Sequence, residues 1–149
     1  MYGDKVRIAW KHFPLEFHAK APLAHLASAA ANEQGKFWPF HDKIFGNQAK
    51  LDKDTYLQYA KDLGLDVKRF EDALNTARGK AVIDADVAEA KSLGVTGTPA
   101  FFVNGKFLSG AKPFTEFATA INAELTRLKI PIPAAAQQAA AGGAPAAGG

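Results

Sequence analysis

The side chains best suited to chemistry in this sequence are its four histidines, and no cysteine accompanies them. Without a thiol, the chain cannot form a disulfide, bind a metal through thiolate or perform dithiol chemistry by itself. His18 and His25 stand about two helical turns apart, and Asp42 follows His41, so both pairs combine residue types that bind metals. Neither pair has a histidine at the usual i+4 spacing, and isolated histidines more often cap or pack. We therefore predict no metal site, no cofactor and no catalytic residue here.

His12 and Ser28 complete the set of chemical candidates. His12 belongs to a Lys-His-Phe-Pro motif, where shaping the exit of a strand is the favoured role. Ser28 follows His25 by one helical turn, but a serine nucleophile also needs an oriented base and an oxyanion site. No nucleophile elbow occurs in the sequence, so the pattern does not favour a hydrolase.

Two clusters of like side chains have both a functional and a structural interpretation. Four aromatic residues could line an apolar groove for a client protein, but aromatics at helical spacing more often belong to a core. We favour the core for them: Phe37, Trp38, Phe40 and Phe45. Three acidic residues are interpreted as a solvated helix face: Asp84, Asp86 and Glu89.

Charge and hydropathy exclude several classes of partner. The net charge is +3, and the basic residues are interspersed with acidic ones instead of forming the stripe that a nucleic-acid backbone requires. We expect no nucleic-acid partner. No stretch reaches the roughly 20 apolar residues of a membrane span, and the first residues contain no apolar core of a signal peptide. We therefore expect no membrane span and no signal peptide in this chain.

Periodicity predicts a strand followed by a block of helices. Val6, Ile8 and Trp10 alternate with polar residues, which is typical of a strand. Helices are then expected over residues 18–34, with Pro22 in the first turn, and 36–46. Three more helices should follow: one capped by Asp52 or Asp54 and ended by Gly64, one capped by Asp66, and one ended by Gly94.

The last third of the chain predicts a hairpin, a helix and a tail. Residues 100–103 and 106–108 are short apolar strands joined by Asn104-Gly105, a pair that favours a two-residue turn. An amphipathic helix is expected from Pro113 to about residue 128. Residues 131–149 are rich in Ala, Pro and Gly, so we expect a flexible tail or linker there.

Four motifs, in this order, resemble the DsbA-like family. Residues 3–8 with 11–15 read GDKVRI and KHFPL, and they resemble the strand after the family's active-site helix. Residues 34–45, beginning QGKFW, and residues 63–70 resemble its helical insertion. Residues 94–105, GVTGTPAFFVNG, are similar to its cis-proline loop and hairpin. The resemblance covers about residues 2–128.

The resemblance implies a fold class, an activity and a location. The fold would be α/β, a thioredoxin-like (DsbA-type) partial domain with a small mixed sheet, an inserted helical block and a disordered C-terminal tail. The activity would be periplasmic or extracytoplasmic thiol:disulfide exchange with cysteine-containing client proteins. A Cys-X-X-Cys pair at a helix N-terminus would supply the reactive thiolate. Pro99 would follow a cis bond, and Gly97, Thr98 and Pro99 would bind an extended client peptide.

The cysteine pair and the strand leading to it have no counterpart in this sequence. In the family that strand is central, between the strand resembled by residues 5–13 and the hairpin, so its loss leaves backbone groups unpaired at about 1–3 kcal/mol each. Three explanations are open: the chain is a fragment, the βα unit comes from another polypeptide or a swapped copy, or the first strand shifts to pair with the hairpin. We favour the fragment.

Two functional hypotheses follow from the resemblance. In the first, residues 1–130 are a DsbA-like domain without its first βα unit, part of a thiol:disulfide oxidoreductase that is redox-inactive as written. In the second, the chain is a cysteine-free thioredoxin-like binding module that holds an extended peptide or a partner subunit. Its exposed strand edges would also permit domain-swapped self-association.

Overall fold

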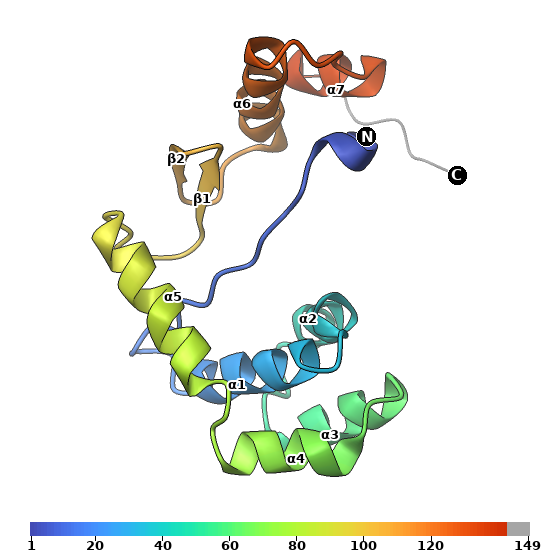
Figure 1. Cartoon of the computed structure of the whole chain (residues 1–149), viewed down its shortest axis with the longest axis vertical. Helices are drawn as coiled ribbons and strands as arrows, with labels where there is room; N and C mark the ends of the chain where they lie inside the picture. The colour runs from blue at the N-terminus through green and yellow to red at the C-terminus, as the bar shows by residue number, and fades with distance from the viewer. Residues whose placement is uncertain (143–149) are drawn as a thin grey trace. The chain divides into compact units, whose positions relative to one another are not determined.

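A computed structural model gives the structure of the chain and describes residues 1–142. The chain divides into two compact units, whose elements are labelled in Figure 1. The helical unit is Lys11–Thr96. The hairpin unit combines Met1–Trp10 with the chain from Gly97 onward. The helical unit is therefore an insertion within the sequence of the hairpin unit.

The helical unit is built around its first helix. Its elements are α1 (Ala21–Asn32), α2 (Phe37–Gly46), α3 (Lys53–Asp62), α4 (Val67–Asn75) and α5 (Lys80–Ser92). α1 contacts each of the other helices in this unit. Phe40, Tyr56 and Phe70 are fully buried between them, and the Phe40 and Phe70 ring centroids lie 5.4 Å apart. Burial of each such side chain contributes roughly 1.5–3 kcal/mol.

Local sequence signals fix the ends and spacing of these helices. Asp52 caps α3 by accepting the Thr55 N–H at 2.8 Å, and Asp66 caps α4 by accepting the Arg69 N–H at 3.0 Å. At the start of α5, a Cβ on Gly79 would lie 2.6 Å from the Cβ of Ala29 in α1. The close approach of α5 to α1 therefore depends on a glycine facing an alanine.

The hairpin unit contains an antiparallel sheet of two strands, β1 (Ala100–Val103) and β2 (Lys106–Ser109). Phe102 lies opposite Phe107 in this sheet, and Val103 lies opposite Lys106. The turn between the strands has positive φ at both positions, 47° at Asn104 and 86° at Gly105, as this dipeptide favours. The predicted hairpin is confirmed.

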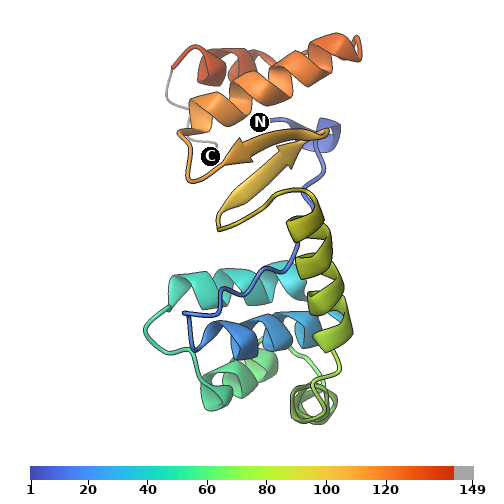
Figure 2. The same cartoon turned by 90° about the vertical axis from the view of Figure 1, so that its left-hand side faces the viewer.

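Helix α6 (Phe114–Arg127) lies alongside one face of the hairpin (Figure 2). The Phe101 and Phe117 rings pack edge to face with centroids 4.7 Å apart. Glu124 is 4% exposed and forms ion pairs with Lys106 at 2.9 Å and with Arg127 at 2.8 Å. Apolar packing and a buried carboxylate together hold the hairpin to α6.

The structure differs from the expected tail over the helix α7 (Ala134–Ala140). Its Ala136 and Ala139 are buried, and α7 packs against α6. Asn122 of α6 donates to the Ala136 carbonyl at 2.9 Å and accepts the Tyr2 hydroxyl at 3.0 Å. Small side chains let two helices approach closely, so a segment without large residues packs here. Residues 143–149 of the expected tail lie outside the described residues.

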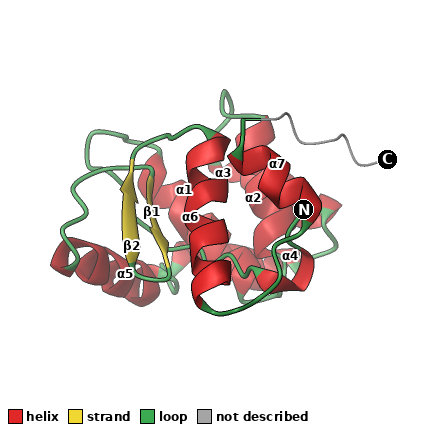
Figure 3. Cartoon of the chain, turned by 90° about the horizontal axis from the view of Figure 1, so that it is seen from above, coloured by secondary structure: helices red, strands yellow, loops and turns green. Residues whose placement is uncertain are grey.

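The predicted strand at Val6–Trp10 is wrong. These residues follow a 3₁₀ turn (η1, Gly3–Lys5) and belong to neither a helix nor a strand, as the loop colouring in Figure 3 makes visible. Ile8 is 72% exposed, so the alternating pattern buries no continuous face. A strand needs a neighbour for its N–H and C=O groups, and within residues 1–142 the sheet contains only β1 and β2. The described sheet is thus antiparallel and not mixed.

No helix among the described residues has the length and apolar character needed to span a bilayer.

Candidate functional site

The loop that carries Gly97, Thr98 and Pro99 opens the second part of the hairpin unit. The Thr98–Pro99 peptide bond is cis, and both residues are exposed. The Pro99 carbonyl accepts the Gly110 N–H at 2.9 Å, which extends the ladder between the strands by one pair. The loop is therefore fixed to the sheet through Pro99 while the residue before it stays accessible.

The outer edge of β1 continues from this loop. In an antiparallel ladder, residue pairs that exchange hydrogen bonds alternate with pairs that do not. Pro99 and Gly110 form a bonded pair, so the next bonded residues of β1 are Phe101 and Val103. Ala100 and Phe102 then direct their N–H and C=O groups away from β2. In the described part of the chain, the sheet has no further strand to pair with them. The edge is available for an added strand.

One face of the same hairpin is apolar and exposed. Phe102 and Phe107 pack against each other with ring centroids 5.0 Å apart, and they remain 41% and 46% exposed. Side chains alternate between the two faces of a strand, so this pair lies on the face opposite to Phe101, which contacts α6. An open edge and an apolar face thus adjoin the Gly97–Pro99 loop.

A second cluster lies within the helical unit, around His12. The His12 N–H donates to Asp86 at 2.9 Å, and Lys11 forms ion pairs at 2.9 Å with both Asp86 and Glu89 of α5. These two carboxylates raise the pKa of Lys11 above its usual range. The Nδ1 atoms of His12 and His25 lie 2.8 Å apart. Segment 11–12 is thereby attached to both α5 and α1.

Burial shapes the electrostatics of this histidine pair. It lowers the pKa of His12, with Asp86 opposing the shift, and it lowers the pKa of His25 to about 4 with a further contribution from His12. Both rings are therefore held neutral near pH 7. Asp86 is 7% exposed, which corrects its expected place on a solvated helix face; Asp84 and Glu89 are exposed as expected. A cation, Lys11, and a buried N–H compensate the carboxylate.

The remaining candidates are dispersed. His41 contacts Asp42 at 2.9 Å, and within residues 1–142 no three His, Cys, Asp or Glu side chains converge as metal ligands. Ser28 donates to the Ala24 carbonyl at 2.8 Å, a bond within its own helix. The chain places His18 in the turn before α1. These residues form no common site.

The aromatic residues of α2 divide between core and surface. Phe40 is fully buried, as expected, and Phe37 is partly buried with its ring 6.3 Å from that of His12. Trp38 and Phe45 are 43% and 55% exposed, so the expectation that all four belong to the core is wrong for these two. A single helix of this length has only one inward face, and these two side chains lie off it.

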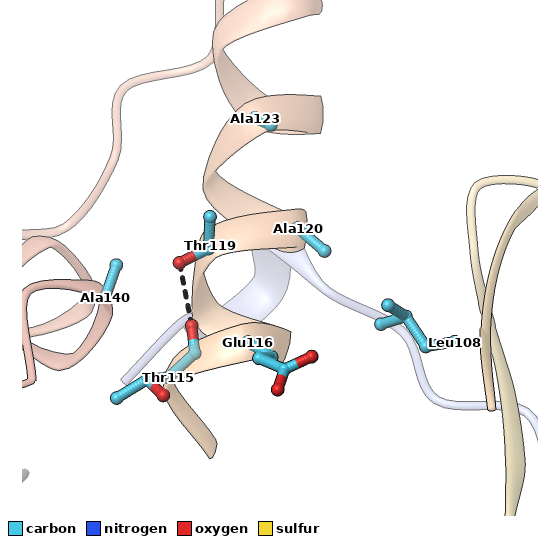
Figure 4. A pocket seen from close by; sticks show the side chains of 7 residues that line it. All are labelled: Leu108, Thr115, Glu116, Thr119, Ala120, Ala123 and Ala140. Carbon is cyan, nitrogen blue, oxygen red and sulfur yellow. Dashed lines mark hydrogen bonds between the residues drawn. The ribbon is translucent and has the colours of Figure 1, made fainter. Parts of the chain in front are cut away.

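A shallow groove of about 450 Å³ runs along α6 between the hairpin and α7 (Figure 4). It is lined by Leu108, Thr115, Glu116, Thr119, Ala120, Ala123 and Ala140. The Thr119 hydroxyl donates to the Thr115 carbonyl at 2.8 Å and is occupied by that bond. Polar groups do not converge in the groove, as a small-molecule site would require.

The sequence of the chain matches a known family. The model of the DSBA-like thioredoxin domain matches residues 2–122, and the chain belongs to this family. A thioredoxin-like oxidoreductase from Silicibacter pomeroyi has a similar structure, with a TM-score of 0.68 and 26% sequence identity. That likeness covers 78% of this chain and 66% of the other. The fold class is therefore α/β and thioredoxin-like, as predicted.

Curated relatives are similar to this chain over only a small part of their own length. Na⁺/H⁺ antiporter NhaA 3 of Salinispora tropica is 44% identical over 102 residues, which cover 68% of this chain and 16% of the antiporter. NhaA 1 of Salinispora arenicola is 38% identical over 127 residues, 83% of this chain and 20% of the antiporter. NhaA of Herminiimonas arsenicoxydans is 39% identical over 110 residues, with 74% and 17% covered. The chain thus spans a fifth or less of these relatives.

Proposed function

We propose that this chain supplies the client-binding part of a DsbA-like thiol:disulfide exchange domain whose cysteine pair is carried by other residues. Residues 1–130 would form that domain without its first βα unit, and α7 would be an added element on α6. The chain contains no cysteine, so it has no redox activity by itself. In the assembled domain, a thiolate attacks a disulfide sulfur, a mixed disulfide forms and a second thiolate leaves.

The open edge of β1 is the observation that carries this proposal. Within residues 1–142 no strand pairs with the outer edge of β1 at Ala100 and Phe102, beside the exposed Phe102–Phe107 face. A strand added there would pair with the N–H and C=O groups of this edge. The same strand would bring a cysteine pair close to Thr98 and Pro99, where an extended client peptide would bind by backbone pairing. Family membership also favours a location outside the cytoplasm, where disulfides persist.

The proposal is tested by restoring the cysteine pair. A βα unit with Cys-X-X-Cys from a DsbA-like protein is joined upstream of Met1, and insulin reduction is measured. We expect no turnover above blank for the chain alone and clear turnover for the fusion. A fusion with Ser-X-X-Ser controls for the added mass. Turnover by the cysteine-free chain, or a folded fusion without turnover, contradicts the proposal.

A second candidate function rests on the antiporter relatives. We propose as the alternative that the chain acts as a cysteine-free binding module within a larger membrane protein of the antiporter kind. The similarity to three antiporters over 16–20% of their length supports this reading. The module would hold an extended peptide or a neighbouring subunit at the β1 edge.

Purified chain distinguishes the two candidates. A binding module should be monodisperse, show near-ultraviolet dichroism and exclude a hydrophobic dye. Dye binding without near-ultraviolet dichroism contradicts the module and supports a domain that lacks part of its sheet. In that case the upstream coding sequence should contain an in-frame Cys-X-X-Cys.

A further inference from the structure

The contact between His12 and His25 constrains how many protons the two rings can hold. Their Nδ1 atoms are 2.8 Å apart, which is hydrogen-bond distance, so one nitrogen donates a proton and the other accepts it. If both rings were imidazolium, both Nδ1 atoms would carry hydrogen and neither could accept. The contact therefore exists only while at least one ring is neutral.

Among the described residues, the two carboxylates nearest His12 already have partners. Asp86 is engaged by the His12 N–H and by Lys11, and Glu89 is engaged by Lys11. On the side of α2, His12 meets the Phe37 ring edge to face. His12 itself is 6% exposed, so water has little access to a charged His12 ring, and the His25 ring is partly buried. Adding the second proton places two like charges in contact in a buried position.

We propose that His12 and His25 form an acid-sensitive latch, which holds segment 11–12 on α1 and α5 near neutral pH and releases it when both rings become protonated. Segment 11–12 is where the chain enters the helical unit after Trp10. Its release frees the connection between the two units of the sequence while the Phe40–Tyr56–Phe70 core is left intact. The latch is independent of the exchange chemistry proposed above.

The direction of the pH dependence follows from the lowered pKa values of both histidines. A histidine that is neutral when folded takes up its proton more readily after release, so acid favours the released state. The latched state therefore loses stability as pH falls from about 6.5, the ordinary value, towards the pKa of about 4 that burial gives His25. Above pH 6.5 the two states bind the same number of protons at these rings, and the latch is insensitive to pH.

The test is amide exchange in the full chain, measured residue by residue by NMR between pH 7.5 and 4.5 and corrected for the intrinsic rate. We expect protection of the His12 amide to fall at least about tenfold between pH 7 and pH 5, while the Phe70 amide in α4 keeps its protection. In the His25→Gln variant, the glutamine oxygen can accept from a protonated His12 ring, so the fall should shrink below about threefold.

Two comparisons keep the result specific. His25→Gln leaves Asp86, Glu89 and their contacts with segment 11–12 in place, so a fall that persists in this variant overturns the latch. His18→Gln, outside the cluster, should behave as the parent. If His25→Gln does not fold, the ring ¹⁵N shifts of the parent decide: one ring of the pair must stay neutral until the His12 amide loses protection. Two protonated rings beside a protected amide overturn the proposal.

Discussion

The helical unit and the hairpin unit differ in how they treat their large apolar side chains. The helical unit fully buries Phe40, Tyr56 and Phe70. The buried residues of the hairpin unit are small, except for one leucine and one carboxylate: Ala118, Glu124, Leu125, Ala136 and Ala139. Three of its aromatic residues are exposed instead: Phe102, Phe107 and Phe114 are each 41% or more accessible. Among the described residues, the helical unit therefore buries three aromatic side chains completely, and the hairpin unit buries none completely.

The difference assigns different roles to the two units. A unit with a closed core is a scaffold, and changes to it should be costly wherever they are buried. Under the proposed function, the apolar face of the hairpin unit and the edge of β1, which no other described strand pairs with, would serve as an interface. Substitutions can therefore be paired across the units to test whether this contrast is real.

The largest effect is expected from Phe40→Ala. Removing a fully buried ring leaves a cavity in the helical unit, and the free energy of unfolding should fall by about 3–5 kcal/mol. The matched change in the hairpin unit, Phe102→Ala, should cost under about 1 kcal/mol because the ring is already 41% exposed. The unfolding free energy of Phe40→Ala is measured by denaturant unfolding followed by helical circular dichroism. For Phe102→Ala, amide exchange in β2 measures the stability of the hairpin. If the two variants lost the same unfolding free energy, the proposed difference between the units would be wrong.

A smaller effect is expected where α5 meets α1. Gly79→Ala would place its Cβ 2.6 Å from that of Ala29, and the overpacking should cost about 1–3 kcal/mol of unfolding free energy. Adding Ala29→Gly makes room and should restore much of the loss. Gly46→Ala is the control, since its Cβ meets nothing within 4 Å. If the double variant is no more stable than Gly79→Ala, the close approach is not the cause.

Acid should lower the stability of the hairpin unit by protonating Glu124. Arg127 and Lys106 hold the pKa of this carboxyl down at about 2, so its contribution to stability is complete above its ordinary pKa of 4.5. That contribution is lost as pH falls from 4.5 towards 2. Glu124→Gln should abolish the pH dependence in this window, as read from the NMR signals of the Phe101 and Phe117 rings. Glu116→Gln, at an exposed pair, should leave it unchanged.

The smallest effect is expected at Tyr56. Its hydroxyl is buried and has no hydrogen-bond partner in the described part of the chain, and burial raises its pKa to about 12. Tyr56→Phe should therefore leave the unfolding free energy unchanged or raise it by up to about 1 kcal/mol. Tyr2→Phe, which deletes a bond to Asn122, should lower it. A clear loss of stability in Tyr56→Phe would mean that the hydroxyl is satisfied in solution.

Elements defined by local chemistry could be predicted from the sequence. The Asn104–Gly105 turn, the caps at Asp52 and Asp66, and Pro22 in the first turn of α1 each depend on a few adjacent residues. The strand at Val6–Trp10 could not, because a strand also requires a neighbour. Helix α7 was missed because its stability comes from packing on α6, which composition does not reveal.

Of the candidate sites, the sequence located the Gly97–Pro99 loop but not the histidine latch. His12 and His25 are 13 residues apart and on different elements, so no spacing rule brings them together. The burial of Asp86 had a weak signal: it falls one turn after Ile83, on the apolar stripe of α5. An acidic residue on such a stripe indicates a buried partner, here Lys11 and the His12 amide.

The side chain of Asn122 links two segments of the hairpin unit that are far apart in the sequence. Its amide oxygen accepts from the Tyr2 hydroxyl and its amide nitrogen donates to the Ala136 carbonyl, so one side chain connects the N-terminal segment to α7. Deleting either Tyr2 or the segment that contains Ala136 therefore removes one of these two hydrogen bonds and leaves Asn122 less well fixed for the other. A probe attached near Tyr2 would therefore report on changes in α7, although the two segments are more than 130 residues apart in the sequence.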